Sequence, residues 1–157
     1  MNRINPPASN ASEPRPSELA LERLVTFFET LTAATVPQLA EVYASDARFK
    51  DPFNEIEGHA PIIKVFEHMF VQLLEPRFVV IERMAHGEQA FLTWELHFRF
   101  VRWPAVAQVI RGATHVRFNA AGQVALHRDY WDAAEELYEK LPLLGALMRA
   151  LKRAANR

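Results

Sequence analysis

Four strand-like segments follow one another without an intervening helix in the second half of the sequence. They cover residues 78–84, 90–102, 107–118 and 123–131, and Gly87, Pro104 and Gly122 stand between them. Alternating apolar and polar residues are typical of strands that bury one face, and glycine and proline mark the turns between strands. Consecutive strands joined by short turns pair antiparallel. The sequence therefore predicts a four-stranded antiparallel sheet that must bury one face.

The first half of the chain supplies helices that can cover this face. Apolar residues recur there at helical spacing, Ser17 is a plausible N-cap, and Pro37 suits the first position of a second helix. Helices first, strands afterwards and a closing helix indicate an α+β domain, and strong sheet curvature would leave a cone-shaped cavity. The predicted elements are helices over residues 17–31 and 37–43, a short strand over 47–50, a helix between Gly58 and Pro76, and a last helix over 132–152.

The length of 157 residues suits one domain. We expect a flexible tail over residues 1–17, which contain four prolines and no apolar stretch of the kind found in secretion signals. Residues 18–153 are expected to form the domain, and residues 154–157 a short C-terminal tail. No apolar run is long enough to cross a bilayer, so the sequence predicts no transmembrane segment and a cytoplasmic protein.

Composition excludes several classes of function. The net charge of −1 argues against nucleic acid as a partner, because phosphate binding requires an excess of lysine and arginine on one face. The absence of cysteine excludes disulfides, thiol catalysis and cysteine-ligated metal centres. His59, His68 and His86 lack a second ligand at metal spacing. We therefore expect neither a metal nor another cofactor.

Residues 117–132 combine a predicted hairpin with the run His-Arg-Asp-Tyr-Trp-Asp. The turn is expected over residues 119–122. Alternate residues of a strand point to the same face, so His127, Asp129 and Trp131 share one face of the sheet. An imidazole and a carboxylate on an apolar wall are what an acid–base pocket requires. The rim of an ordinary core can carry the same residues.

The pairing of the two hairpin strands decides which residues of the preceding strand join this face. With a four-residue loop, Thr114 lies on the pocket face and His115 on the opposite face, whereas a one-residue shift would exchange them. Gly112, which has no side chain, would then leave room for a ligand beside Asp129. The predicted pairs are Phe118 with Gln123, Thr114 with His127, and Gly112 with Asp129.

The outer face of the same strand carries apolar residues. Val124, Leu126 and Tyr130 alternate with the pocket residues and are expected to point away from them. Exposed apolar side chains call for cover, and a two-fold contact between identical subunits is the commonest kind. We therefore predict a homodimer through the outer sheet face, although the terminal helix could cover these residues instead.

The order of elements resembles the nuclear transport factor 2-like superfamily, which includes ketosteroid isomerases and SnoaL-type polyketide cyclases. The resemblance spans roughly residues 18–135. It implies a curved antiparallel sheet wrapped around N-terminal helices. It rests on the spacing of Tyr43, Asp51-Pro52, Gly58, Arg117-Phe118, Gly122 and Tyr130-Trp131, and on the run His127-Arg128-Asp129-Tyr130.

The resemblance to polyketide cyclases implies that Asp129 is the catalytic acid or base. The resemblance to ketosteroid isomerases places Phe27 and Thr114 where those enzymes carry the tyrosine and carboxylic acid of an oxyanion hole. Phe27 has no donor, so steroid isomerisation is disfavoured. An epoxide hydrolase of the limonene type would need a carboxylate at Ala113, so that activity is disfavoured too.

Asp51 has two interpretations. It resembles the general base of ketosteroid isomerases, and Phe49 and Phe53 flank it with apolar surface. Alternatively, an Asp-Pro pair begins a turn in which the carboxylate accepts hydrogen bonds from the next backbone amides.

Two classes of function follow. The first is cofactor-independent acid–base chemistry, such as cyclisation, isomerisation or hydration, on a small apolar molecule. Asp129 would be the main acid or base, His127 its partner and Asp51 a second carboxylate, with the pocket lined by Trp131, Thr114, Phe27, Gly112 and Phe53. The second is a domain that binds a ligand or another protein without catalysis.

The amphipathic C-terminal helix is expected to pack on its own domain or, alternatively, to contact a membrane surface.

Overall fold

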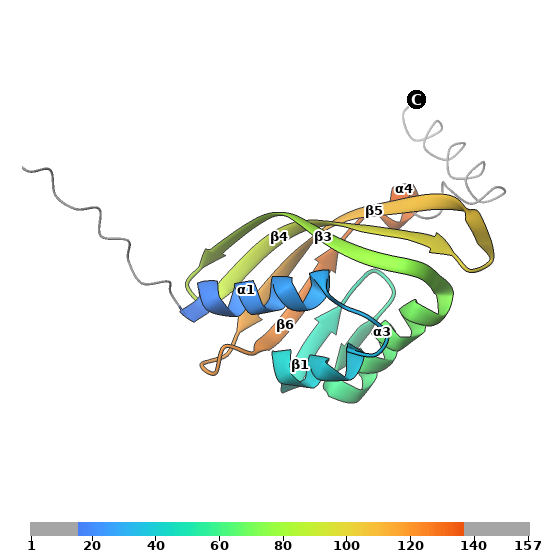
Figure 1. Cartoon of the computed structure of the whole chain (residues 1–157). Coiled ribbons are helices and arrows are strands. Elements are labelled where there is room, and N and C mark those ends of the chain that lie inside the picture. The colour runs from blue at the N-terminus through green and yellow to red at the C-terminus, as the bar shows by residue number, and fades with distance from the viewer. Residues whose placement is uncertain (1–15, 137–157) are drawn as a thin grey trace, which may run out of the picture.

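The computed structural model describes residues 16–136. Six strands form one sheet in the order β2-β1-β6-β5-β4-β3, and helices α1 and α3 pack beneath its curved face (Figure 1). In chain order the elements are α1 (Pro16–Glu29), η1 (Val36–Gln38), α2 (Leu39–Val42), β1 (Tyr43–Lys50), β2 (Glu55–Glu57), α3 (His59–Gln72), β3 (Leu73–His86), β4 (Gln89–Phe100), β5 (Trp103–Phe118), β6 (Val124–Tyr130) and α4 (Ala133–Glu136). The predicted α+β architecture with a curved sheet is confirmed.

The core lies between the helices and the concave face of the sheet. Helix α1 contributes Leu24 and Phe28, helix α3 contributes Ile62 and Phe66, and alternate residues of β4 complete the layer. This arrangement follows from apolar residues at helical spacing on the helices and at a period of two on the strand. Trp94, Leu96 and Phe98 of β4 are buried beneath the helices.

Several boundaries differ from the prediction. The second predicted helix is split into η1 and α2, and Tyr43 already begins a strand that runs parallel to β6. The short strand β2 was not predicted. Helix α3 ends at Gln72, before Pro76, because Leu73 already pairs with Phe100 of β4. Tertiary pairing of this kind overrides a local stop signal.

Strand β3 contains two irregularities that bend it over the helices. At the first, Glu75 adopts a φ of 50°, a conformation that side chains with a Cβ rarely occupy. At the second, the pairing shifts between Val80 and Glu82, and the amide of Val80 donates to the Glu29 carboxylate at 2.9 Å. The carboxylate at the end of α1 thus satisfies a backbone donor of β3 and holds the helix against the sheet.

The pairing of β5 with β6 differs by two residues from the predicted pairing. Thr114 pairs with Asp129 rather than with His127, and Val116 pairs with His127. The turn is longer than predicted, since β5 ends at Phe118 and β6 begins only at Val124. A shift of two residues preserves the faces. The assignment of Thr114 to the concave face is therefore right, although its predicted partner was wrong.

A bulge in β6 overturns one part of the predicted outer face. Arg117 pairs with Leu126 and Phe118 with Val124, so that Ala125 has no partner. One extra residue reverses the side-chain alternation before it. Val124 consequently points into the core and is 0% exposed, whereas Tyr130 beyond the bulge is 48% exposed.

The predicted terminal helix is described only over α4. Its remaining residues and their proposed contacts with the domain or a membrane lie outside the described residues, as do residues 1–15 of the predicted tail. The described part of that tail, Pro16 and Ser17, belongs to α1. None of the helices within residues 16–136 is long and apolar enough to span a membrane.

Candidate active site

A buried histidine connects two strands on the concave face of the sheet. His127 of β6 is 4% exposed, and its Nδ1 lies 2.7 Å from the Tyr43 hydroxyl at the start of β1. Its Nε2 lies 2.8 Å from Oδ1 of Asp129, two residues along the same strand. The rings of Phe28 and Phe49 pack against the imidazole. The parallel pairing of β1 with β6 places Tyr43 beside this histidine.

The Tyr43 hydroxyl determines which nitrogen of His127 carries the proton. Burial, together with the nearby negative charge of Asp129, raises the pKa of Tyr43 well above its ordinary value. Tyr43 therefore stays protonated, and we infer that its O–H group donates a hydrogen bond to Nδ1, because this hydroxyl has no other acceptor within residues 16–136. Nε2 then carries the imidazole hydrogen and donates to Asp129.

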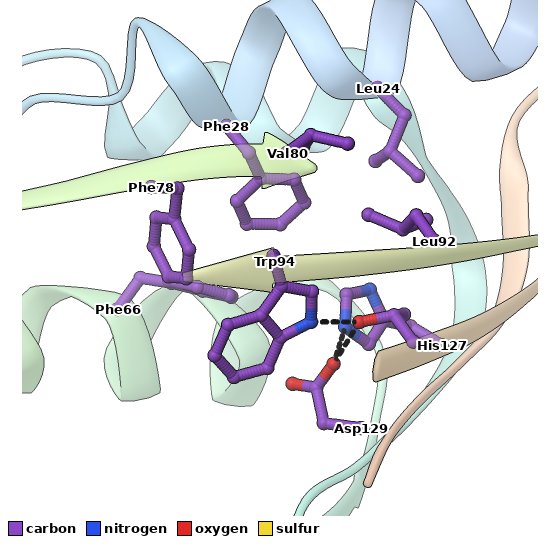
Figure 2. Close-up of a pocket in the computed structure, with 10 residues that line it drawn as sticks. Leu24, Phe28, Phe66, Phe78, Val80, Leu92, Trp94, His127 and Asp129 are labelled. Carbon is purple, nitrogen blue, oxygen red and sulfur yellow. Dashed lines mark hydrogen bonds and ion pairs between the residues drawn. The ribbon is translucent and has the colours of Figure 1, made fainter. Parts of the chain in front are cut away.

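A second chain of hydrogen bonds reaches the same carboxylate from β4 and β5. The indole Nε1 of Trp94 donates to Oγ1 of Thr114 at 2.7 Å, and the Thr114 hydroxyl donates to Oδ1 of Asp129 at 2.5 Å. Thr114 is buried. Its hydroxyl is held in one orientation because it accepts a hydrogen bond from Trp94 and donates one to Asp129. The two chains converge on Asp129 (Figure 2).

The two oxygens of Asp129 differ in their surroundings. Oδ1 accepts hydrogen bonds from Thr114 and His127, whereas Oδ2 has no hydrogen-bond partner among the described residues. The side chain is 16% exposed. A carboxylate held through one oxygen keeps the second oxygen available to a ligand. Asp129 also borders three separate hollows in the structure.

The first hollow, the inner cavity, lies between α1 and the sheet and measures about 30 Å³. It has room for roughly two water molecules, and aromatic rings of Phe28, Phe66, Phe78 and Trp94 wall it off (Figure 2). Phe66, Phe78 and Trp94 also border the next hollow. These three rings therefore separate the inner cavity from the larger space beyond.

The second hollow, the main groove, measures about 700 Å³, within the range of small-molecule sites. One wall is α3, and the other is the concave face of β4, β5 and β6. Trp131 and Phe53 pack edge to face at its border, with ring centroids 5.4 Å apart.

The third hollow, the rim groove, measures about 520 Å³ and is lined by Lys50, Asp51, Pro52, Arg128, Asp129, Tyr130, Trp131 and Asp132.

The structure places Asp51 at the border of both grooves, with its carboxylate occupied by a turn. Oδ1 accepts from the backbone amides of Phe53 and Asn54 at 2.7 and 2.6 Å, and the Asn54 side chain donates to both oxygens. This geometry is the one expected from the turn-forming interpretation of Asp51. Asp51 shapes the rim beside Asp129, and its oxygens are already hydrogen-bonded.

Gly112 has a different role from the one predicted. Asp129 of β6 pairs with Thr114 instead of Gly112. On its other side Gly112 pairs with Trp94 of β4, and a Cβ built on Gly112 would lie 2.4 Å from Cζ2 of the Trp94 indole. The space left by the missing side chain is therefore filled by protein. Phe27 was also predicted to line the pocket. In the structure its neighbour Phe28 lines the inner cavity, and Phe27 packs at the edge of the core.

Two members of the site, Tyr43 and Trp94, were not predicted as site residues. The role of Trp94 depends on its pairing with Gly112 across β4 and β5, which the sequence alone does not give. Tyr43 is far from His127 in sequence, and their contact depends on the parallel β1–β6 pair.

His115 lies on the outer face as predicted, where it stacks on Phe91 with ring centroids 4.5 Å apart. Partial burial, with Arg117 and Arg128 nearby, lowers its pKa.

Residues 16–136 contain no cluster of three histidine, aspartate or glutamate side chains able to hold a metal ion. The hydrogen-bonded set described above consists of one carboxylate, one imidazole and three neutral donors. Such a set can hold, accept and return a proton at Asp129.

Comparisons with known proteins agree with this architecture. A comparison with proteins of curated function finds no match. A solved structure of an NTF2-like protein of unknown function from Burkholderia pseudomallei has a TM-score of 0.66 and 18% identity, covering 77% of this chain and 94% of that chain. A candidate SnoaL-like polyketide cyclase from Shewanella putrefaciens has a TM-score of 0.63 and 20% identity, covering 76% and 96%. An LEH-like epoxide hydrolase from M. tuberculosis has a TM-score of 0.62 and 14% identity, covering 87% and 96%.

These structural similarities show the nuclear transport factor 2-like fold. The sequence also matches the model of a family, described as a SnoaL-like domain, over residues 24–127. This region contains α3, strands β1 to β5 and most of the residues that surround His127. The chain therefore belongs to the SnoaL-like domain family.

Proposed function

We propose that the protein catalyses cofactor-independent acid–base chemistry on a small, largely apolar molecule bound in the main groove, with Asp129 as the acid or base. The observation that carries this proposal is the unequal environment of the two Asp129 oxygens. Oδ1 is held by Thr114 and His127, while Oδ2 has no partner within the described chain. Cyclisation, isomerisation and hydration all require a group that removes a proton at one atom and returns it at another.

In this mechanism Oδ2 of Asp129 accepts a proton from the ligand and later returns it. Thr114 and His127 are positioning residues, because they fix the carboxylate through Oδ1. A positioned general base contributes about 10²–10⁴-fold to a rate. Hydrogen bonds from two fixed donors also stabilise the carboxylate, so the reaction proceeds without the side chain having to reorient.

The surroundings of Asp129 support an apolar substrate. Trp131 and Phe53 border the main groove, and the inner cavity is too small for more than water or a small substituent. We therefore place the reacting atom of the substrate in the main groove, next to Oδ2. The apolar part of the substrate would lie against Trp94, Leu96 and Phe98, which form the apolar wall of the sheet.

A second candidate function is ligand binding without turnover. The observation that favours it is the state of Asp51, whose oxygens are held by the turn and are poorly suited to act as a second acid or base. Turnover of a substrate by the wild-type protein, lost in an Asp129 variant, would show catalysis and not binding alone.

The Kemp elimination of 5-nitrobenzisoxazole tests the proposal without knowledge of the natural substrate. A base removes the carbon-bound hydrogen of this flat, apolar molecule, the N–O bond breaks, and a coloured cyanonitrophenolate forms. We expect the wild-type protein to accelerate the reaction and Asp129→Asn to reduce the rate by about 10²-fold or more. The control is Glu95→Gln, which removes a carboxylate on the outer face and should leave the rate unchanged. Equal rates in wild type and Asp129→Asn would contradict the proposal.

We also propose that the protein forms a homodimer through the outer face of its sheet. Phe91, Met84 and Tyr130 are 48%, 66% and 48% exposed there. Phe91 pairs with Met84 across β3 and β4, and it stacks on His115 of β5, so Met84, Phe91 and His115 form a row across three strands. A dimer in light scattering that becomes a monomer in Phe91→Glu would support this assembly. A wild-type monomer at tens of micromolar would contradict it.

A further inference from the structure

Helix α3 lines the main groove with a stripe of polar side chains. Lys64, His68 and Gln72 follow one another at intervals of four residues, so they lie along one side of the helix. All three border the main groove. Lys64 is the only lysine or arginine among the described residues that line it, and it forms no ion pair within residues 16–136. Its ammonium group is therefore a cation that borders a groove with a largely apolar lining.

The opposite wall carries the opposite charge. Asp129 lies on β6, and Asp51 lies just beyond the end of β1. Between these carboxylates and the α3 stripe, the groove is lined mainly by apolar side chains. An anionic ligand would be attracted to the α3 side and repelled from the Asp129 side, so the charges of the groove favour one orientation.

The cations of the neighbouring rim groove are already engaged. Lys50 forms an ion pair with Glu55 at 2.5 Å, and the guanidinium of Arg128 lies over the ring of Tyr130, 4.9 Å from its centroid. A ligand that bound its anionic group there would have to compete with these contacts. Lys64 requires no such displacement, which favours the main groove over the rim groove as the place for an anion.

We propose that the main groove binds a flat aromatic molecule that carries a carboxylate or phenolate, with the anionic group at Lys64 and the aromatic part against the sheet. The inference rests on the proposed function, because it concerns the same groove, and it specifies the substrate class. A ligand in this orientation directs its uncharged end toward Asp129, where the proton transfer is proposed to occur.

Calorimetric titration with a matched pair of probes tests the inference. 2-Naphthoate and 2-naphthamide have nearly the same shape and differ in charge. We expect the wild-type protein to bind 2-naphthoate on the order of threefold to fivefold more tightly than 2-naphthamide, as for a partly exposed ion pair. The preference should decrease at high salt, because the Lys64 side chain is exposed. Lys64→Met should remove the preference, and Lys64→Glu should reverse it.

Lys50→Met is the matched control, since it removes a lysine from the rim groove and should retain the preference for 2-naphthoate. A preference that survives Lys64→Met, or one that is lost in Lys50→Met instead, would overturn the inference. Equal binding of the two probes by the wild-type protein, or no measurable binding of either, would also overturn it.

The binding test can fail or succeed independently of the proposed catalysis. If the naphthoate preference depends on Lys64 while Asp129→Asn leaves the Kemp rate unchanged, the ligand class stands and the catalytic role of Asp129 falls. If Asp129→Asn abolishes the Kemp reaction while Lys64→Met leaves the probe preference intact, the catalytic proposal stands and this inference falls.

Discussion

Gly112 and Trp94 face each other across the β4–β5 pair, and the indole of Trp94 occupies the space that a side chain at Gly112 would need. The position of this indole matters because its Nε1 donates to Thr114, which in turn holds Asp129. A residue without a side chain on β5 thereby controls the orientation of a carboxylate on β6.

Gly112→Ala is therefore expected to displace the Trp94 indole. We predict that it lowers the free energy of unfolding by about 1–3 kcal/mol, the usual cost of overpacking a core. Urea denaturation measures the change. Trp94→Phe has a smaller ring, so the double variant should lose less stability than the sum of the two single variants. Additive losses would show that the two positions do not compete for space.

Tyr43→Phe removes the donor to Nδ1 of His127 and leaves that nitrogen without a partner. We expect it to lower the free energy of unfolding by about 1–3 kcal/mol, as for other buried groups left unsatisfied. Nitrogen NMR of labelled histidine should show hydrogen on Nε2 in the wild type and a mixture of tautomers in the variant. A wild-type spectrum with hydrogen on Nδ1 would contradict the assigned direction of the Tyr43 hydrogen bond.

The raised pKa of Tyr43 also predicts a loss of stability in alkali. The unfolded chain releases this proton near the ordinary value of 10.0, whereas the folded protein retains it to higher pH. Above that value the folded state binds more protons than the unfolded state, so the free energy of unfolding falls as the pH rises, by up to about 1.4 kcal/mol per pH unit. Below pH 10 the contribution is complete. The stability difference between wild type and Tyr43→Phe should therefore shrink between pH 10 and 11.

Thr114→Val preserves the shape of residue 114 but removes both of its hydrogen bonds. The Trp94 N–H loses its acceptor and Asp129 loses a donor, so we expect a loss of about 1–3 kcal/mol in the free energy of unfolding. The Kemp rate should also fall, because Asp129 is held less firmly. Thr114→Ser keeps the hydroxyl and should restore the rate. A rate that falls as far in Thr114→Ser as in Thr114→Val would contradict the role of the hydroxyl in holding Asp129.

Glu75 adopts a φ of 50° where β3 bends, just before Pro76. Glycine accepts this conformation without a Cβ clash, so Glu75→Gly is expected to raise the free energy of unfolding by about 0.5–1 kcal/mol. The ion pair between Glu75 and Arg99 is solvent-exposed and contributes little. Glu75→Ala removes the same ion pair but keeps the clash, so thermal denaturation should show no gain for this control.

The sequence alone was enough to predict the α+β fold, the extents of α1 and most of α3, and the concave position of Thr114, His127 and Asp129. These predictions depend on the helical period of apolar residues and on the alternation of side chains along a strand, both of which are local. Alternation survives a register error of two residues, and this is why Thr114 was placed on the right face although its predicted partner was wrong.

Only the tertiary structure decided the contacts that make the site. The parallel pairing of β1 with β6 brings Tyr43 to His127, 84 positions away in sequence, and the β4–β5 register brings Trp94 to Gly112. The bulge at Ala125, which turns Val124 into the core, also depends on which partner strand it meets. From the sequence, the carboxylate of Asp51 could either line a pocket or accept hydrogen bonds within a turn. In the structure it accepts hydrogen bonds from the amides of Phe53 and Asn54, as in a turn. Local periodicity determines which face a residue occupies, but the pairing of distant strands determines which residues meet on that face.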